Sequence, residues 1–331
     1  MYGSGMFRFD KWKGLPRGGR SEVKRHSLQP YIWVLTSSFA FSWMSILTSL
    51  AGTGCPWQII ALVRSLVPLV LVAVWVKLDG VRLVFWGSRI LWVRSIAGSC
   101  SLVGSFYALT HMHPSEVATI SNIFPIWVAL LSWPMLGEVP SPVVWLSALT
   151  GVVGVFLVQM PYADGLNPTA LVVVAVSFLT ALAMMGLHQL KELDPRTVVV
   201  HFSGVSTAFC LAALALLPLD PPPEPLELHH LLLLGAVGVT ATVGQLFLTL
   251  AFTSGVPSRV SVVALTQVVF VLVLDVALLG LRPEPVKLLG VVLILAPTAW
   301  IMLRKTRRVR PVIPSPPGDK RSLQPTVSCK G

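Results

Sequence analysis

Charged side chains are scarce in this sequence of 331 residues. They make up 12% of the chain, against 54% hydrophobic residues, and the mean hydropathy is +0.76. Soluble proteins usually contain about 25% charged residues, so the scarcity excludes an ordinary soluble domain. Apolar runs of about 18 residues or more, each a candidate membrane span, recur along the chain instead. We therefore expect an integral, multi-pass membrane protein surrounded by a lipid bilayer.

Sequence patterns that carry catalysis or hold metals are also few. The chain has no GxxxxGK[ST], HExxH or GxSxG pattern, so it predicts neither an ATP-driven pump nor these classes of hydrolase. The four cysteines, none in a CxxC pair, are Cys55, Cys100, Cys210 and Cys329. His111 and His113 offer only two ligands, too few for a structural metal site. We expect a protein that is not an enzyme and needs no cofactor or metal.

The apolar runs and their Gly- and Pro-rich connections predict ten membrane spans. The spans are expected at about 30–50, 58–77, 89–110, 114–136, 142–160, 167–188, 196–217, 228–253, 258–280 and 285–303. Lipid cannot satisfy exposed backbone groups, so each span should be a helix that forms its own hydrogen bonds. Strands of a membrane barrel would alternate apolar and polar residues, and these runs do not.

The net charge of +11 is concentrated in two tails. Residues 8–25 contain seven Lys and Arg, and residues 304–330 contain eight. Such charge beside membrane spans is typical of cytoplasmic segments, so both termini should be cytoplasmic, in a plasma membrane or a bacterial inner membrane. Nucleic-acid binding explains this distribution poorly. Residues 1–29 and 304–331, rich in Gly, Pro and basic residues, are expected to be disordered.

A weak internal repeat connects the two halves of the sequence. When the chain is shifted by 143 residues, positions 108–146 align without a gap on positions 251–289, and 13 of the 39 pairs are identical. Apolar bias alone would give about three or four identities. Pro114-Ser115, for example, aligns with Pro257-Ser258. The chain therefore divides into two related units.

The two units are expected to be inverted relative to each other. They comprise residues 30–160, with helices 1–5, and residues 161–303, with helices 6–10. Because five is an odd number, the second unit crosses the membrane in the opposite sense. Inverted repeats favour alternating access, in which two halves rock around a site near the middle of the bilayer. The fold class predicted is an all-α membrane protein of ten transmembrane helices in two inverted five-helix repeats.

Five short stretches carry a resemblance to a known family. They are residues 107–109 (YAL), 114–118 (PSEVA), 125–133 (PIWVALLSW), 136–138 (LGE) and 146–155 (LSALTGVVGV). These stretches are similar to the EamA-type family of the drug/metabolite transporter superfamily, and residues 64–66 resemble the family's Arg-Phe-Leu element. The resemblance implies ten helices and transport of small metabolites, without fixing the solute. The second half departs from the family pattern, with Val268 in place of a proline and Leu281 in place of a glutamate.

Ionisable residues within the spans are the candidates for gating, because such residues are costly in lipid. Arg64 and Asp275 should lie in the outer third of the membrane, where Glu116 also begins a span. Arg64 is either an anion anchor or an outer-gate partner of Asp275, and the alternative is a structural ion pair or snorkelling. Arg94 lies about five residues inside the third span, where snorkelling towards the cytoplasmic surface is the competing explanation.

Uncharged polar and aromatic residues near the middle of the spans are candidates for a solute cavity. With Arg64, these candidates are Tyr107, Asn122, Trp127, Thr266 and Gln267. They could bind the polar groups of a solute. Hydrogen bonds between helices are the alternative for the amides and the hydroxyl, and a lipid-facing position is the alternative for the tryptophan.

Two prolines interrupt the fourth span. Pro125 and Pro134 should kink the helix, and the freed backbone groups would be satisfied by neighbouring helices or water. The matching span at 258–280 lacks both prolines, so the two spans need not bend alike. Gly137-Glu138 should end the fourth span at the inner surface.

The sequence therefore predicts a secondary transporter of a small polar or amphipathic metabolite, amino-acid-like or another organic anion. A nucleotide-sugar transporter of the same fold is the first alternative. A membrane-embedded enzyme or lipid-handling protein, or a receptor that transports nothing, is a more distant one. The expected partners are a small-molecule substrate and the lipid bilayer, and a homodimer is among the assemblies that the sequence allows.

Overall fold

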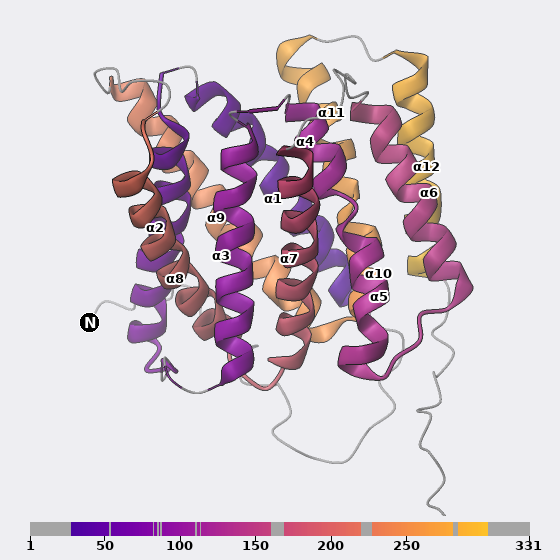
Figure 1. The fold of residues 1–331 in the computed structure, drawn as a ribbon, viewed down its shortest axis with the longest axis horizontal. Coiled ribbons are helices and arrows are strands. Elements are labelled where there is room, and N and C mark those ends of the chain that lie inside the picture. The colour runs from indigo at the N-terminus through magenta and orange to yellow at the C-terminus, as the bar shows by residue number, and fades with distance from the viewer. Residues whose placement is uncertain are drawn as a thin grey trace, which may run out of the picture.

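The computed structural model describes residues 28–52, 54–81, 83–84, 86, 88–109, 111–112, 114–159, 169–219, 227–280 and 284–303. All regular structure in this part of the chain is helical (Figure 1). The segments are α1 (Gln29–Ala51), α2 (Trp57–Leu78), α3 (Arg89–Leu109), α4 (Pro114–Ser121), α5 (Phe124–Leu136), α6 (Pro142–Gln159), α7 (Thr169–Gln189), α8 (Pro195–Leu216), α9 (Leu228–Ser254), α10 (Pro257–Ala264), α11 (Thr266–Leu279) and α12 (Pro285–Leu303). Apart from residues 28 and 29, the two expected tails lie outside the described residues.

Nine stretches of the described chain are long and apolar enough to cross a membrane. Two of them, Val117–Leu136 and Pro257–Leu278, run through consecutive helices, α4–α5 and α10–α11. α3 is 21 residues long but is not among the nine. Large apolar side chains on the helices face outwards, and Leu171 and Trp133 are 75% and 69% exposed. Lipid accepts such surfaces without the cost that water would impose, so the fold is that of an integral multi-pass membrane protein.

The expected fourth and ninth spans are each interrupted near the middle. α4 ends at Ser121 and α10 at Ala264, and these positions differ by the 143 residues of the sequence repeat. Pro125 lies in the first turn of α5, where a missing N–H costs little because no helical carbonyl would accept from it. The break before α11 contains no proline, since Leu265 alone separates it from α10. The two spans therefore break alike, and proline is not what both breaks share. Pro134 lies inside α5, which continues past it to Leu136.

Matching glycines end the second segments of both interrupted spans. Gly137 follows α5 with φ = 67°, and Gly280 follows α11 with φ = 65°. This left-handed conformation costs an L-residue roughly 1–2 kcal/mol and closes a helix C-terminus. The N–H groups of Gly137 and Glu138 donate to the carbonyl oxygens of Trp133 and Ser132, at 2.9 and 3.2 Å. The sequence prediction of a helix end at Gly137-Glu138 agrees with this geometry.

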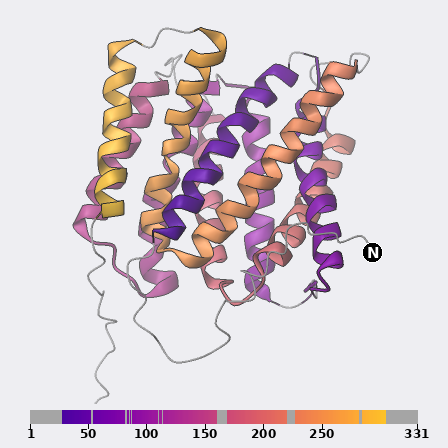
Figure 2. The same cartoon turned by 180° about the vertical axis from the view of Figure 1, so that it is seen from behind.

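The helices pack in matching pairs. If α1–α6 are taken to correspond in order to α7–α12, the packing of α1 on α9 matches that of α7 on α3. Likewise α2 on α9 matches α8 on α3, and α1 on α11 matches α7 on α5. The pairs α2–α8 and α6–α12 match themselves, as helices beside a two-fold axis would. Figure 1 shows α3 beside α7, and Figure 2 shows α1 crossing α9 on the opposite side.

Candidate functional site

A narrow cavity lies where α1, α2, α3, α8 and α9 meet. Its lining consists of Phe41, Arg64, Ser65, Pro68, Leu102, Phe202, Ser203, Ala241 and Gln245. Arg64 is seven residues from the start of α2 and Gln245 is nine residues from the end of α9, so each lies about 10 Å or more from the nearer end of its helix. The cavity is therefore inside the bundle, and helices from both halves of the chain form its walls.

The guanidinium of Arg64 supplies the positive charge of this cavity. It lies 5.9 Å from the ring centroids of both Phe41 and Phe106. No carboxylate among the described residues forms an ion pair with it. An aromatic face attracts a cation by about 2 kcal/mol or more when water is excluded, against the several kcal/mol that burying an ion costs. The described residues therefore leave the charge of Arg64 without a compensating anion.

Gln245 adds an unpartnered hydrogen-bond donor to the same cavity. Its side chain is 7% exposed, and its Nε2 group has no hydrogen-bond partner. The hydroxyl of Ser65, by contrast, donates to the carbonyl of Ala61 at 3.0 Å. A buried amide N–H without an acceptor costs about 1–3 kcal/mol. A bound solute oxygen would remove that cost, so the free donors of the cavity favour a solute that carries oxygen atoms or negative charge.

Arg94 is a second arginine inside the bundle, located on α3. It is 1% exposed, and its guanidinium lies over the ring of Phe202 with the Cζ atom 4.1 Å from the ring centroid. Its Nε and Nη1 groups have no hydrogen-bond partner. The snorkelling expected as an alternative is not observed, since the charge is buried between helices. Phe202 contacts Arg94 and also lines the Arg64 cavity.

Buried polar side chains join α3 to α8 near Arg94. Ser95 Oγ and His201 Nδ1 are 2.8 Å apart, and the edge of the Trp92 ring meets the His201 ring at 4.7 Å between centroids. Ser99 and Ser206 share a hydrogen bond of 2.8 Å. These contacts hold α3 against α8 beside Arg94.

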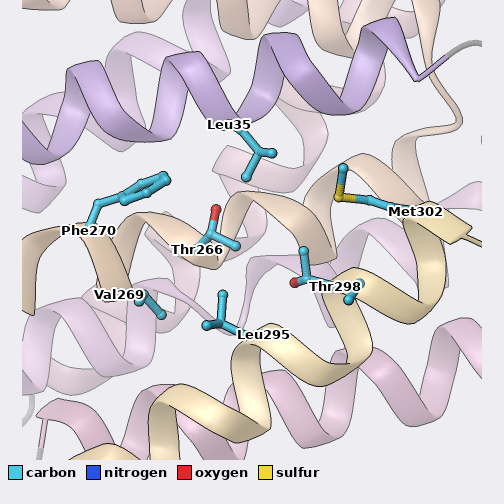
Figure 3. Close-up of a pocket in the computed structure, with 8 residues that line it drawn as sticks. Leu35, Thr266, Val269, Phe270, Leu295, Thr298 and Met302 are labelled. Atoms are coloured by element: carbon cyan, nitrogen blue, oxygen red, sulfur yellow. The ribbon is translucent and has the colours of Figure 1, made fainter. Parts of the chain in front are cut away.

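Thr266 lies in a different pocket from Arg64. The pocket, about 260 Å³ in volume, is bounded by Leu35, Thr266, Val269, Phe270, Leu295, Thr298, Ala299 and Met302 (Figure 3). The Thr266 hydroxyl donates to the carbonyl of Val263 at 2.7 Å, and the Thr298 hydroxyl donates to that of Ile294 at 2.8 Å. Both hydroxyls serve their own helices, which leaves an apolar pocket between α1, α11 and α12.

The other predicted cavity residues do not line the Arg64 cavity. Trp127 Nε1 donates to Ser177 Oγ at 3.0 Å and thereby connects α5 to α7. Asn122 donates to the carbonyl of Ala118 at 2.7 Å, beside the break between α4 and α5. Tyr107 is 37% exposed and lies against the ring of His111. Gln267 is half-buried on α11.

The predicted gating residues are likewise not brought together. Asp275 is half-buried on α11, where Lys287 of α12 is the neighbouring charge. Arg64 lies among α1, α2 and α3 instead, so the two do not pair. Glu116 begins α4, but its side chain lies outside the described residues. Within the described chain, no group of three or more His, Cys, Asp or Glu residues could hold a metal ion.

One ion-pair network was not expected from the sequence. Arg196, in the first turn of α8, donates to Asp194 at 2.9 Å and to Asp79, which follows α2. Its guanidinium also lies 5.0 Å from the Trp75 ring centroid. The network therefore ties the end of α2 to the beginning of α8.

Sequence reasoning also missed most of the cavity wall. Gln245 gave a usable signal, because it is an amide inside an apolar span. Phe41 and Phe202 gave none, since phenylalanine is equally common on lipid-facing surfaces.

Comparison with known proteins identifies the family. The EamA-like transporter family matches this chain twice, over residues 28–160 and 167–303. The pseudopaline exporter CntI of Pseudomonas aeruginosa (strain UCBPP-PA14) is 31% identical over 237 residues, which are 71% of this chain and 82% of the exporter. A riboflavin transporter of Vibrio cholerae is 26% identical over 195 residues, or 57% of this chain and 65% of that protein.

The fold has a solved counterpart as well. One crystal structure superimposes with a TM-score of 0.72 at 19% sequence identity, covering 82% of this chain and 95% of the other. At that identity the likeness concerns the fold alone. The family match extends over most of the chain, and its named relatives are transporters rather than enzymes. This chain therefore belongs to the EamA-like transporter family, and it is a membrane transporter of small molecules.

Proposed function

We propose that this protein is a secondary transporter that moves a small polar or amphipathic metabolite, amino-acid-like or another organic anion, by alternating access. The observation that carries the proposal is the Arg64 cavity. It holds a cation that forms no ion pair with the described residues. Such a charge inside a membrane protein is costly and is retained for a function. The anionic group of a solute would be its missing partner.

Two inverted repeats would supply the two halves that move. With α4–α5 and α10–α11 each counted as one span, and with α3 included, the described helices correspond to ten spans. The double family match and the matching helix contacts support repeats at 30–160 and 161–303. Rocking of such halves exposes a central site to each side of the membrane in turn.

The Arg64 cavity lies where those halves meet. α1, α2 and α3 come from the first repeat, and α8 and α9 come from the second. A solute bound there would contact both halves, so its binding energy would depend on their relative position. Arg64 is the solute-binding residue that we retain from the sequence prediction, and Gln245 joins it.

The membrane orientation follows from charge. We propose cytoplasmic termini in a plasma membrane or bacterial inner membrane, because the basic residues are concentrated in both tails. The network of Arg196, Asp79 and Asp194 would then lie on the cytoplasmic side.

A homodimer stays a prediction of the sequence. The relatives named for pseudopaline and riboflavin handle different small molecules, so the solute of this chain must be measured.

A flux measurement tests this function. The full chain would be reconstituted into phosphatidylcholine vesicles and assayed with amino acids, other organic anions and nucleotide sugars, beside Arg64→Ala and Arg64→Lys. We expect saturable flux of at least one anionic solute, a loss of about tenfold or more in Arg64→Ala, because a charge-assisted hydrogen bond contributes about 1.5–3 kcal/mol, and partial flux in Arg64→Lys.

The control for this experiment is Leu66→Ala. Leu66 lies on the same helix, is 40% exposed and does not line the cavity, so its truncation should leave flux within about twofold of wild type. Folded wild-type protein that moves none of the solutes would contradict the proposed function.

A further inference from the structure

Arg94 is a buried charge that the Arg64 cavity does not explain. It does not line that cavity, and it is among the largest fully buried side chains of the described chain. Its Nε and Nη1 groups lack hydrogen-bond partners. Its guanidinium makes a cation–π contact with the face of the Phe202 ring. Stability alone does not account for such a group, since an uncompensated buried charge destabilises a fold.

The neighbouring helices are shaped around this side chain. A Cβ atom at Gly98 would lie 2.6 Å from Arg94 Nη1, and one at Gly186 would lie 3.0 Å from Arg94 Cβ. Alanine at Gly98 would therefore displace the guanidinium. Glycines on α3 and α7 thus leave room for a long cationic side chain between α3, α7 and α8, where an apolar residue would fit with less cost.

Arg94 and Arg64 occupy different depths along the bundle. The contact between Arg196 and Asp79 shows that α8 begins at the end of the bundle where α2 ends, and α3 begins there as well. Arg94 is five residues from the start of α3, whereas Arg64 is fourteen residues from the end of α2. At 1.5 Å per residue they lie roughly 8 Å and 21 Å from this end. Phe202 contacts one cation and the cavity of the other.

We propose that Arg94 is a second anion-binding station, which receives the carboxylate or phosphate of the transported solute after it leaves the Arg64 cavity. The inference rests on the proposed transport function. A planar guanidinium binds the oxygens of either group through parallel N–H donors. Movement of Phe202 off Arg94 would expose those donors to the cavity. The anionic group then passes between two fixed cations instead of crossing the bundle unpaired.

A solute fits this station better than an anionic lipid does. Arg94 is 1% exposed, and α7 and α8 cover it through Gly186 and Phe202. A lipid headgroup would have to enter between these helices, whereas a solute in the Arg64 cavity is separated from Arg94 by Phe202. The experiment includes an arm that distinguishes the two sources of phosphate or carboxylate.

The first part of the test separates binding from transport. Arg94→Gln and Arg94→Lys would be compared with wild type in phosphatidylcholine vesicles, using the anionic solute with the highest flux in the panel. We expect Arg94→Gln to lower flux about tenfold or more, Arg94→Lys to restore part of it, and the dissociation constant of the solute to change less than about threefold. Wild-type flux in folded Arg94→Gln would overturn the inference and leave the proposed function standing.

The thermal unfolding midpoint of Arg94→Gln distinguishes a transport role of Arg94 from a structural one. Removing an unpaired buried charge should leave the unfolding midpoint of Arg94→Gln unchanged or raise it. A midpoint lowered by more than about 5 °C would show that Arg94 stabilises the fold and would overturn the inference.

Vesicles with added phosphatidylglycerol test whether an anionic lipid binds Arg94. If this anionic lipid stabilised wild type but not Arg94→Gln, Arg94 would be a lipid site.

The second part does not depend on transport. Inorganic phosphate is the probe, and Arg64→Gln is the background, because it leaves Arg94 as the remaining arginine of the two. We expect phosphate to raise the unfolding midpoint of Arg64→Gln but not that of the double variant Arg64→Gln, Arg94→Gln. If phosphate shifted the unfolding midpoints of the two variants equally, Arg94 would not be an anion-binding site. That outcome would overturn the inference even if wild type proved to transport nothing.

Discussion

Two residues, Arg64 and Gln245, define the chemistry of the central cavity. One offers a guanidinium without an ion pair among the described residues, and the other offers an amide donor without an acceptor. Arg64 lies on α2, in the first half of the chain, and Gln245 lies on α9, in the second half. Their unsatisfied hydrogen-bonding capacity is the basis on which we propose a polar or anionic solute.

Gln245→Ala should weaken solute binding more than it weakens the fold. The lost hydrogen bond is expected to be worth about 0.5–1.5 kcal/mol, which corresponds to a KM raised about 2- to 10-fold. The matched control is Gln267→Ala, which removes the same amide from α11 outside the cavity. Concentration-dependent flux of both variants checks this. Equal KM values for the two variants would place the solute elsewhere.

Among the helices, the ends and the interruption near Pro125 were predictable, and the interruption before α11 was not. Gly and Pro next to apolar runs placed the helix ends within about two residues of the observed ones. The interruption before α11 has no such signal, because Leu265 is an ordinary apolar residue. The prolines of the fourth span predicted a kink there and left open whether the matching span bends alike; the structure interrupts both spans. The break before α11 is therefore not explained by a local proline or glycine.

Gly280→Ala should lower stability through backbone strain alone. Its φ of 65° is disfavoured for alanine, and no atom would meet the added Cβ, so the cost should be roughly 1–2 kcal/mol. Gly235→Ala is the control, since that glycine lies within helix α9 with similar free space around it and should be neutral or stabilising. Unfolding midpoints in detergent compare the two. A midpoint for Gly280→Ala as high as that for Gly235→Ala would contradict the assigned conformation.

For the whole molecule, the two inverted repeats stay a prediction, which the way the helices pair supports. The alignment of 108–146 on 251–289 predicted matching units, and the contacts of α1–α6 with α7–α12 come in matching pairs. The cavity could be predicted only in part. Arg64 was found because a charge in an apolar span is conspicuous, whereas Phe202 and Ser203 became recognisable only once α8 was packed against α2 and α3.

Alternating access, as we propose it, requires that the Arg64 cavity open to both sides of the membrane in turn. The most direct measurement is the labelling of Ser203→Cys, a position on the cavity wall, in a background without the native cysteines. Sealed phosphatidylcholine vesicles would be treated with a membrane-impermeant maleimide from the inside or the outside. Leu228→Cys, at the start of α9 and with Leu228 72% exposed, is the control that should be labelled from one face only.

Alternating access predicts that Ser203→Cys is labelled from both faces and that the transported solute slows both reactions, because the solute occupies the cavity in each state. Labelling confined to one face with and without solute, in vesicles where Leu228→Cys behaves as expected, would contradict alternating access through the Arg64 cavity.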